Sequence, residues 1–332
     1  MFRQTTTKTA LAALVAGVLV SLGGAATATA QSLTLKISGE NPETGLDLQM
    51  AQKFADVLSE QLGDDFSYEL FHTQALGDEN VHLQMIRTGQ IDIYPMGSDA
   101  VKLDPAWAVF DMPFLFSDRD AVARLLDGEI GDKLRASMRE QAGLELLAFG
   151  ELGFRQITNN VRPIVTPADL NGVKLRVPGS KTRVLSFEGF GASPITMNFG
   201  ELYLALQQGT VDGQENPLLT IKNRSLFEVQ KYMSLSGHVY TPVTFVMNGA
   251  RYDGLSDEHK EAVKAAALEA AMHTRALGTE ADASLLDELG QSMEVNEIDL
   301  AAFQEAAVPI WEEIGEIAGK ELADEMIAAA QQ

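Results

Sequence analysis

The sequence predicts an α/β fold built as two lobes. Segments that alternate like strands take turns with segments of helical periodicity, which is the pattern of a parallel sheet covered by helices. This pattern runs twice along the chain, once before residue 150 and once after it. The 332 residues also exceed what one compact domain usually holds.

The first set contains strands separated by helices. Residues 33–38 alternate as a strand, and residues 45–62 place Met50, Phe54 and Leu58 at helical spacing. The remaining expected elements are a strand at 66–71, a helix at 79–87, a strand at 91–96, a helix opened by Ser117 with Asp120 three positions on, a helical pattern ending near Gln141, and a strand at 144–150. The first three strands, with helices between them, indicate a parallel sheet.

The second set begins with a one-turn helix. Thr166 is the expected N-cap, Pro167 takes the first helical position and Gly172 follows the end. The next elements are the strand "VKLRV" (173–177), a helix in "VLSFEGFG", a strand in "ASPITM", a helix in "GELYLALQQG" and a strand at 238–248.

A long helix follows. Ser256, with Asp257 and Glu258 after it, is typical of a helix start, and the helical pattern reaches about Leu289, where Gly290 ends it. About 34 residues would span ~50 Å, longer than one lobe, so this helix can run across both. A last helix is expected at about 300–319.

The first thirty residues have the three-part pattern of a secretory signal peptide. Arg3 and Lys8 precede the apolar stretch "LAALVAGVLVSLGGAA", and small residues follow at Ala28–Ala30. We expect cleavage after Ala30 and a periplasmic protein. The apolar stretch is too short for a confident membrane span.

Charge and composition exclude several classes of partner. Without Arg3 and Lys8 of the signal, 23 bases stand against 47 acids, a formal charge of −24. Such a surface repels nucleic acid and anionic membranes. The chain has no cysteine, so it has no disulfide and lacks the residue that a bacterial lipoprotein needs for its lipid anchor.

Motifs for catalysis and for cofactors are missing. The five histidines show no helical ligand spacing, "GFGASP" lacks the third glycine of a dinucleotide site, and Asp212 and Glu215 lack the ligand ladder of a calcium loop. There is no G-x-S-x-G elbow and no phosphate loop. We therefore expect no catalytic residue, no metal and no cofactor.

Arg176 has two possible environments. Alternation puts Val173, Leu175 and Val177 on one face of their strand and Lys174 and Arg176 on the other. Taken alone, this pattern favours a solvated second face.

Two further residues offer an alternative. Arg155 lies on a strand entering the same set, and Asn216 lies just ahead of Pro217. Two guanidinium forks and an amide on one sheet can converge on a carboxylate. Spacing alone leaves both environments open.

Five longer stretches follow one another at a characteristic spacing between Leu33 and about Ala318: "QALGDEN" (74–80), "RTGQIDI" (87–93), "LNGVKLRVPGS" (170–180), "GASPITMNFGELYLALQQGTVDGQENPL" (191–218) and "FEVQKYM" (227–233). In these stretches the chain resembles the periplasmic solute-binding proteins of tripartite ATP-independent periplasmic (TRAP) transporters, the DctP family. The resemblance implies two α/β lobes joined by crossing strands and a long shared helix, with ligand in the cleft between them.

The resemblance also implies site residues. The family's signature arginine, which grips a ligand carboxylate bidentately, matches Arg176, and its second arginine matches Arg155. The family asparagine matches Asn216, the aromatic that packs over ligand matches Phe199, and an acidic position that reads hydroxyls in sugar-acid members matches Glu79. The expected N-terminal lobe comprises residues 31–153 plus about 246–270, and the expected C-terminal lobe comprises 154–245 plus about 271–332.

For the ligand, the resemblance favours a hydroxylated monocarboxylate such as a uronate or aldonate. "GFRQITN" around Arg155 is similar to sugar-acid members, and Glu79 would repel a second carboxylate. Sialate is disfavoured by Gly97, where sialate binders carry an acid. A C4-dicarboxylate or 2-oxoacid binder remains the alternative, and an extracytoplasmic enzyme or an adhesion domain is less favoured. The implied partners are one small and one large TRAP membrane subunit.

Overall fold

The strands of the computed structural model, which describes residues 32–330, belong to one ten-stranded sheet. They are β1 (Leu33–Ser38), β2 (Phe66–Phe71), β3 (Ile93–Met96), β4 (Leu144–Asn159), β5 (Lys174–Val177), β6 (Ser193–Thr196), β7 (Gly213–Pro217), β8 (Tyr232–Leu235), β9 (Tyr240–Asn248) and β10 (Glu294–Glu297). Their order is β2-β1-β3-β9-β4-β7-β5-β6, with β8 between β4 and β10. The predicted signal peptide lies outside the described residues.

The helices cover both faces of this sheet. They are α1 (Leu46–Leu62), α2 (Glu79–Thr88), α3 (Arg119–Leu126), α4 (Glu129–Ala142), α5 (Lys181–Gly189), α6 (Leu202–Gln207), α7 (Leu218–Asn223), α8 (Gly249–Asp253), α9 (Asp257–Leu289), α10 (Leu300–Ala318) and α11 (Lys320–Ala330). Within residues 32–330, none is both long and apolar enough to cross a bilayer.

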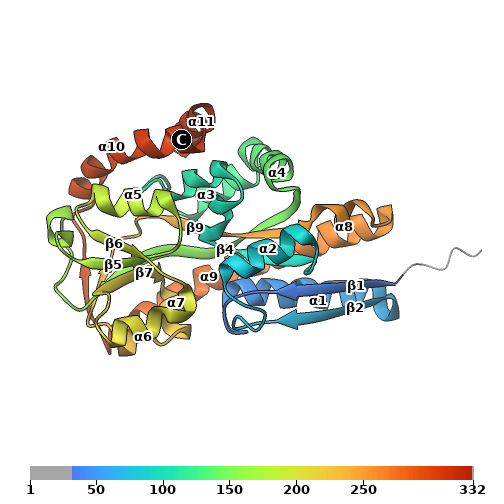
Figure 1. The fold of residues 1–332 in the computed structure, drawn as a ribbon, viewed down its shortest axis with the longest axis horizontal. Helices are drawn as coiled ribbons and strands as arrows, with labels where there is room; N and C mark the ends of the chain where they lie inside the picture. Colours follow the sequence, from blue (N-terminus) through green and yellow to red (C-terminus); the bar gives the residue numbers. More distant parts are fainter. Residues whose placement is uncertain (1–31, 331–332) are drawn as a thin grey trace, which may run out of the picture. The chain divides into compact units, whose positions relative to one another are not determined.

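Two long strands join two groups of parallel strands. β1 pairs in parallel with β2 and β3, and β5 pairs in parallel with β6 and β7, which confirms the predicted parallel α/β pattern. We call the part around β1–β3, α1 and α2 the N-terminal lobe, and the part around β5–β8 and α5–α7 the C-terminal lobe (Figure 1). β4 pairs with β9 as far as Phe154 and with β7 from Arg155 onward. This crossover places Arg155 at the junction of the lobes.

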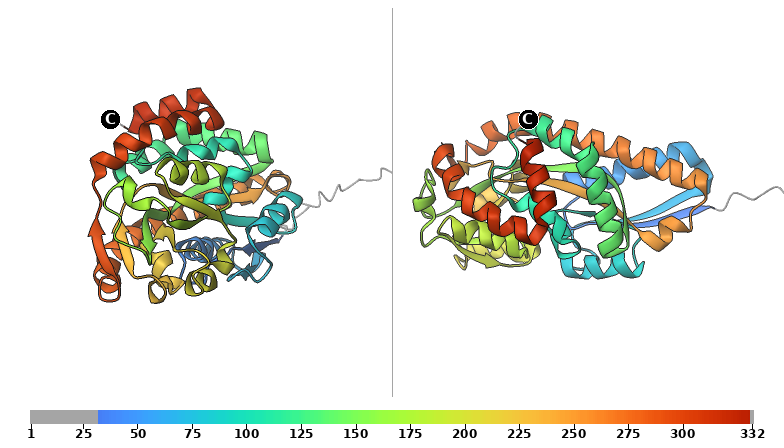
Figure 2. Two further views of the ribbon diagram at one scale, coloured as in Figure 1. Left: turned by 60° about the vertical axis from the view of Figure 1, so that its left-hand side comes forward. Right: turned by 90° about the horizontal axis from the view of Figure 1, so that it is seen from above.

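The long helix is confirmed. The Ser256 hydroxyl accepts a hydrogen bond from the backbone N–H of His259 at 3.1 Å, which caps the start of α9. α9 packs against α1 of the N-terminal lobe, against β4, and against α7 of the C-terminal lobe, so it runs along both lobes (Figure 2). The helix continues through Gly278, where a Cβ would lie only 2.5 Å from Glu151 Oε1 of β4, so the glycine allows the close approach of this carboxylate.

Several predicted boundaries are wrong, among them the start of α3 and the end of β4. The cap of α3 is Asp118, whose Oδ1 accepts from the backbone N–H of Ala121 at 2.8 Å, while Ser117 donates to the other carboxylate oxygen. The strand expected to end at Gly150 continues to Asn159. The register shifts between Glu151 and Gly153, and the φ of +112° at Gly153 is one that glycine tolerates, so the strand passes through a bulge there.

Candidate functional site

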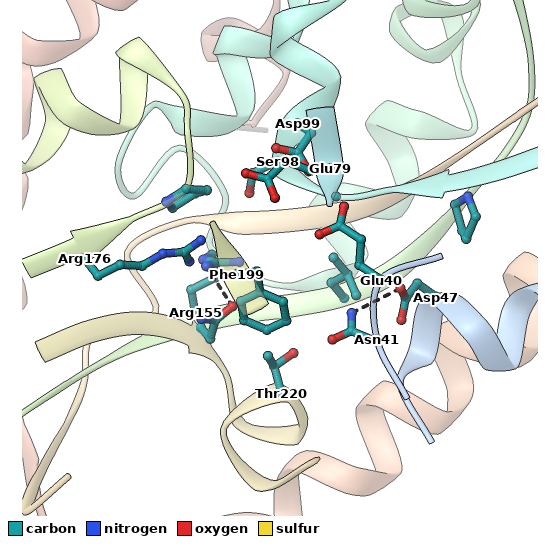
Figure 3. A pocket seen from close by; sticks show the side chains of 15 residues that line it. Glu40, Asn41, Asp47, Glu79, Ser98, Asp99, Arg155, Arg176, Phe199 and Thr220 are labelled. Atoms are coloured by element: carbon teal, nitrogen blue, oxygen red, sulfur yellow. Dashed lines mark hydrogen bonds between the residues drawn. The ribbon is translucent and has the colours of Figure 1, made fainter. Parts of the chain in front are cut away.

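A cavity of about 80 Å³ lies between the lobes, at the carboxyl ends of β1, β3, β5 and β7 (Figure 3). Ligands of open α/β sheets bind at such ends. The cavity is well below the ~300–1,000 Å³ of drug-sized sites, so it fits a small molecule. It is lined by Glu40, Asn41, Asp47, Glu79, Pro95, Gly97, Ser98 and Asp99 of the N-terminal lobe, by Leu152 and Arg155 of β4, and by Arg176, Pro178, Phe199, Asn216 and Thr220 of the C-terminal lobe.

All the residues that the sequence singled out for ligand binding line this cavity. Their surroundings differ, however. Arg176, Arg155 and Asn216 lie on the C-terminal side or at the crossover, and Glu79 lies on the opposite wall. The cavity therefore has a basic side and an acidic side.

Arg176 is a buried guanidinium without a carboxylate partner. It is 3% exposed, and its Nε and Nη2 both donate to the carbonyl oxygen of Met197, at 3.0 and 2.7 Å. No Asp or Glu within residues 32–330 forms an ion pair with it. Burial lowers the pKa of Arg176 to about 10, although Glu215 opposes this shift. Figure 3 shows the guanidinium pointing into the cavity, where an anion would compensate its charge.

Arg155 and Asn216 already have protein partners. Arg155 Nε donates to Glu215 Oε2 at 2.5 Å, and its Nη2 donates to Glu215 Oε1 at 3.0 Å and to Asn216 Oδ1 at 2.9 Å. Asn216 Nδ2 in turn donates to Gln214 Oε1 at 2.5 Å. These two residues face the cavity from fixed positions, but the charge of Arg155 is compensated within the protein.

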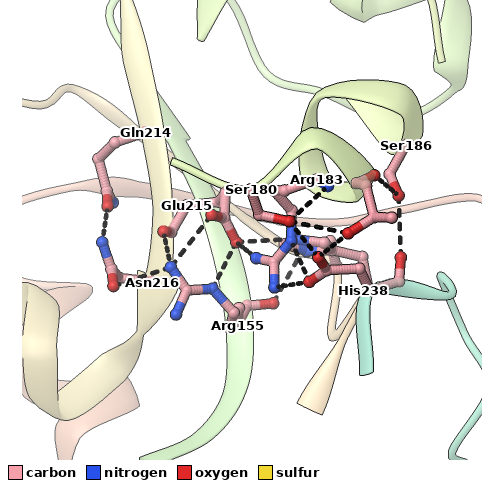
Figure 4. Close-up of polar contacts among 11 residues, drawn as sticks. Arg155, Ser180, Arg183, Ser186, Gln214, Glu215, Asn216 and His238 are labelled. Atoms are coloured by element: carbon pink, nitrogen blue, oxygen red, sulfur yellow. Dashed lines mark hydrogen bonds and ion pairs between the residues drawn. The ribbon is translucent and has the colours of Figure 1, made fainter. Parts of the chain in front are cut away.

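A buried ionic network holds Arg155 in place (Figure 4). Arg183 on α5 donates to Glu215 Oε2 at 2.7 Å and to Asp111 Oδ1 at 2.6 Å, and His238 Nε2 lies 3.1 Å from Glu215 Oε2. Burial acts to raise the pKa of Glu215, but the guanidinium groups of Arg155 and Arg183 outweigh it and hold that pKa far below its usual range. Two arginines and two carboxylates thus balance in the interior.

Sequence reasoning did not find this network. It considered Glu215 only as a possible calcium ligand, and it singled out neither Asp111 nor Arg183. The available signal was the run "GQEN", three polar side chains in a strand that is fully buried. Such a run requires partners from elsewhere in the chain.

Phe199 stands between two guanidinium groups. Its ring centroid is 5.6 Å from the Arg176 guanidinium carbon and 4.5 Å from that of Arg224. The ring packs at the edge of the C-terminal core and also lines the cavity. Stacked cations hold an aromatic ring by attraction to its π face. Arg224 was not predicted.

The opposite wall carries four carboxyl groups, those of Glu40, Asp47, Glu79 and Asp99. Lys102 Nζ lies 3.8 Å from Glu79 Oε1 and 3.4 Å from Asp99 Oδ1. Glu79, the first residue of α2, is 4% exposed, and its Oε2 has no hydrogen-bond partner in the described chain. Burial, and next Asp99, raise its pKa. Burial also raises the pKa of Glu40, which accepts a hydrogen bond from the Tyr94 hydroxyl, well above its usual range. Within residues 32–330 no group of three or more His, Asp or Glu is arranged to hold a metal ion.

Asp47 belongs to the same wall. Asn41 Nδ2 donates to its Oδ2 at 3.1 Å, while its Oδ1 has no partner among residues 32–330. Burial raises its pKa from 3.8 to about 6. The folded protein therefore holds the Asp47 proton more tightly than the unfolded chain does, and the ionised side chain costs stability above pH 6.

This cost gives a testable expectation. Asp47→Asn should stabilise the protein at pH 7.5 by up to ~3 kcal/mol, the value of a shift of about two pKa units. The gain should shrink toward pH 4, where wild-type Asp47 is protonated in the folded state. Urea unfolding across this pH range measures the difference. Asp56→Asn, an exposed carboxylate on the same helix, is the control and should change little. A gain from Asp47→Asn that does not vary with pH would contradict the expectation.

Known proteins share this fold and much of this sequence. The family of bacterial extracellular solute-binding proteins, family 7 (DctP), matches residues 37–317. The chain is 36% identical to the 2,3-diketo-L-gulonate-binding periplasmic protein YiaO of Escherichia coli K12, over 87% of this chain and 88% of YiaO. The sugar acid binding protein DctPAm from Advenella mimigardefordensis, in complex with galactonate, has a TM-score of 0.87 and 31% identity, covering 91% of this chain and 98% of that one.

A second solved structure binds a different class of acid. It is a TRAP periplasmic solute-binding protein from Sulfurospirillum deleyianum with bound succinate, with a TM-score of 0.85 and 27% identity, covering 90% of this chain and 99% of that one. These relatives are substrate-binding transport proteins with acids as ligands. The chain therefore belongs to the DctP family, the two-lobed solute-binding proteins of TRAP transporters.

Proposed function

We propose that this protein is the periplasmic solute-binding subunit of a TRAP transporter and that it captures a small hydroxylated monocarboxylate, such as an aldonate or uronate. It delivers this acid unchanged to one small and one large membrane subunit. The observation that carries the proposal is Arg176, a buried guanidinium that faces the cavity and forms no ion pair with any acid of the described residues 32–330. Cleavage of the signal after Ala30 and the expected bounds of the two lobes belong to the same proposal.

The ligand carboxylate lies against Arg176 in this proposal. Two of the five guanidinium N–H groups are used by Met197, which leaves three for the ligand. Asn216 and Arg155, fixed by their own partners, line the same side, and the Phe199 ring packs over the bound acid. The negative surface of the protein provides no long-range attraction for an anion, so affinity depends on these local groups.

The acidic wall determines which functional groups the ligand can carry at the end away from its carboxylate. Glu79 Oε2 and Asp47 Oδ1 are buried acceptors that have no hydrogen-bond partner in the part of the chain that the structure describes, and a ligand hydroxyl can donate to them. A second carboxylate would instead be repelled by those carboxylates of this wall that are ionised, a repulsion that Lys102, which lies beside two of them, offsets only in part. Sialate is disfavoured by the resemblance alone, since Gly97 stands where sialate binders are expected to carry an acid; a Cβ at Gly97 would lie 2.9 Å from Leu152 Cδ1, so a larger residue there would require the Leu152 side chain to shift.

The alternative is a C4-dicarboxylate binder, and the succinate-bound structural neighbour supports it. Pairs of acids that differ only in a second carboxylate distinguish a binder of hydroxylated monocarboxylates from a binder of dicarboxylates. D-Galactonate and galactarate, like D-erythronate and meso-tartrate, differ only in that the second member of each pair has a carboxylate in place of a terminal hydroxymethyl group. We expect the monoacid of at least one pair to bind at micromolar concentration, and its diacid at least ~10-fold more weakly.

Thermal-shift screening followed by calorimetry at pH 7.5 measures these affinities. Tighter binding of the diacids, or of succinate, would favour the C4-dicarboxylate alternative. It would contradict the proposal that the acidic wall binds hydroxyl groups of the ligand. Recovery of a chemically altered acid after incubation would indicate an enzyme instead. Stabilisation by no acid of a broad panel would contradict solute binding altogether.

A further inference from the structure

One hydrogen bond between two side chains crosses from lobe to lobe beside the cavity, in addition to the bond that Asn223 Nδ2 of α7 donates to the backbone carbonyl oxygen of Thr44 at 2.9 Å. Asn198 Nδ2, in the C-terminal lobe, donates to Asp78 Oδ2, in the N-terminal lobe, at 2.8 Å. The two residues are 120 positions apart in the chain. A bond between side chains of different lobes forms only while the lobes are close together.

Each partner sits next to residues of the candidate site. Asn198 follows Met197, whose carbonyl oxygen holds Arg176, and precedes Phe199, whose ring lines the cavity. The bond therefore attaches the segment that positions the guanidinium and the ring to the opposite lobe.

On the other lobe, Asp78 caps α2. Its Oδ1 accepts from the backbone N–H groups of Asn80 and Val81, at 3.0 and 3.1 Å, which leaves Oδ2 for Asn198. Glu79, the next residue, belongs to the acidic wall. The helix cap uses Oδ1 of Asp78 and the cross-lobe hydrogen bond uses Oδ2. A mutation can therefore change one of these two interactions and keep the other.

We propose that the Asn198–Asp78 pair is a positioning latch: it holds the basic and acidic sides of the cavity at the separation that the ligand needs, and it slows ligand release without touching the ligand. The inference rests on the proposed function. A hydrogen bond to a carboxylate contributes about 10- to 100-fold to an equilibrium constant when it forms only in one of two states. The latch should therefore appear mainly in the dissociation rate, because the closed lobes must separate before the ligand leaves.

A reciprocal exchange tests the latch. Asn198→Asp places two carboxylates opposite each other and should weaken binding of D-galactonate about 10- to 100-fold, mostly through faster dissociation. Asp78→Asn keeps an N-cap residue and a possible amide–amide bond, so its effect should be smaller. The double variant Asp78→Asn/Asn198→Asp restores one donor and one acceptor and should return to within ~3-fold of wild type.

Controls exclude a folding defect and a general charge effect. Urea unfolding without added acid should give similar midpoints for all variants. Asn171→Asp adds the same charge at an exposed position of the C-terminal lobe and should leave binding unchanged. If Asn198 only supported the local structure, the double variant Asp78→Asn/Asn198→Asp would not regain the affinity for D-galactonate that Asn198→Asp loses. Equal dissociation rates for Asn198→Asp and wild type would overturn the latch and leave the proposed function intact.

The latch can also be tested if D-galactonate and the other acids fail to bind, a result that would overturn the proposed function. The chain has no cysteine, so spin labels can be placed by Gln84→Cys on α2 and Glu188→Cys on α5, both exposed. We expect Asn198→Asp to shift the distance distribution between these labels to longer values, and the reciprocal exchange to reverse the shift. A distribution that Asn198→Asp leaves unchanged would overturn the latch.

Discussion

Arg176→Ala is expected to abolish micromolar binding of the carboxylate ligand. The guanidinium is 3% exposed, so the ion pair with a bound acid forms away from water. Removing one partner of such a pair typically costs ~3–5 kcal/mol, which is two to three orders of magnitude in affinity. Calorimetry with the tightest acid of the matched panel measures the loss.

Arg176→Lys should lose most of the affinity as well. Met197 takes up the Nε and one Nη2 N–H group, and the remaining N–H groups form the planar fork that matches a carboxylate. An ammonium group offers a point charge and cannot serve Met197 and a bidentate carboxylate in the same geometry. Binding of Arg176→Lys at wild-type strength would contradict the bidentate contact.

Stability measurements distinguish lost binding from lost folding. Burial lowers the pKa of Arg176 to about 10, so its charge costs the protein stability, while Met197 loses two hydrogen bonds when the side chain is removed. These effects oppose each other, and without added acid Arg176→Ala should stay within ~1 kcal/mol of wild type. Arg162→Ala, an exposed arginine outside the cavity lining, is the control and should retain binding.

Local sequence pattern was sufficient to predict several of the strands and helices that form the two lobes. β1 and β2 have the predicted bounds, and α9 begins and ends at the residues that the Ser256 cap and Gly290 indicate. These elements are specified by alternation, periodicity and capping, which depend on neighbours in the chain. The bulged strand β4 was cut short because Gly150 and Gly153 have the same local appearance as a strand end.

The resemblance to a family, rather than local sequence pattern, identified the site residues as members of one binding site. Alternation alone favoured a solvated face for Lys174 and Arg176, and the fold corrects this for Arg176, which is buried and lines the cavity, while Lys174 is exposed. The acidic wall was recognised only at Glu79. Glu40 and Asp47 were missed because their relation to Arg176 depends on how the two lobes meet, which no short stretch of sequence encodes.

The buried network around Glu215 was missed for the same reason, and it gives the second large expected effect. Glu215→Gln should destabilise the protein by ~3–5 kcal/mol, because it removes one counterion shared by two buried guanidinium groups. Arg183 keeps Asp111, whereas Arg155 has no other carboxylate partner within residues 32–330. The loss is a large share of the ~5–15 kcal/mol that stabilises a typical protein, so urea unfolding at pH 7 should show it clearly.

The pH dependence separates this effect from a simple packing defect. The pKa of Glu215 is held far below its usual range in the folded state, so the stability that its charge contributes is fully present above the ordinary glutamate pKa of ~4.3 and is lost only as the pH falls below it. The difference between wild type and Glu215→Gln should therefore stay constant from pH 8 to about pH 5 and narrow in more acidic solution. Glu69→Gln, which removes a carboxylate paired on the surface with Lys36, should cost less than ~1 kcal/mol throughout. A difference for Glu215→Gln that persists unchanged at pH 3 would mean that the amide disturbs packing, and that the ion pairs contribute little.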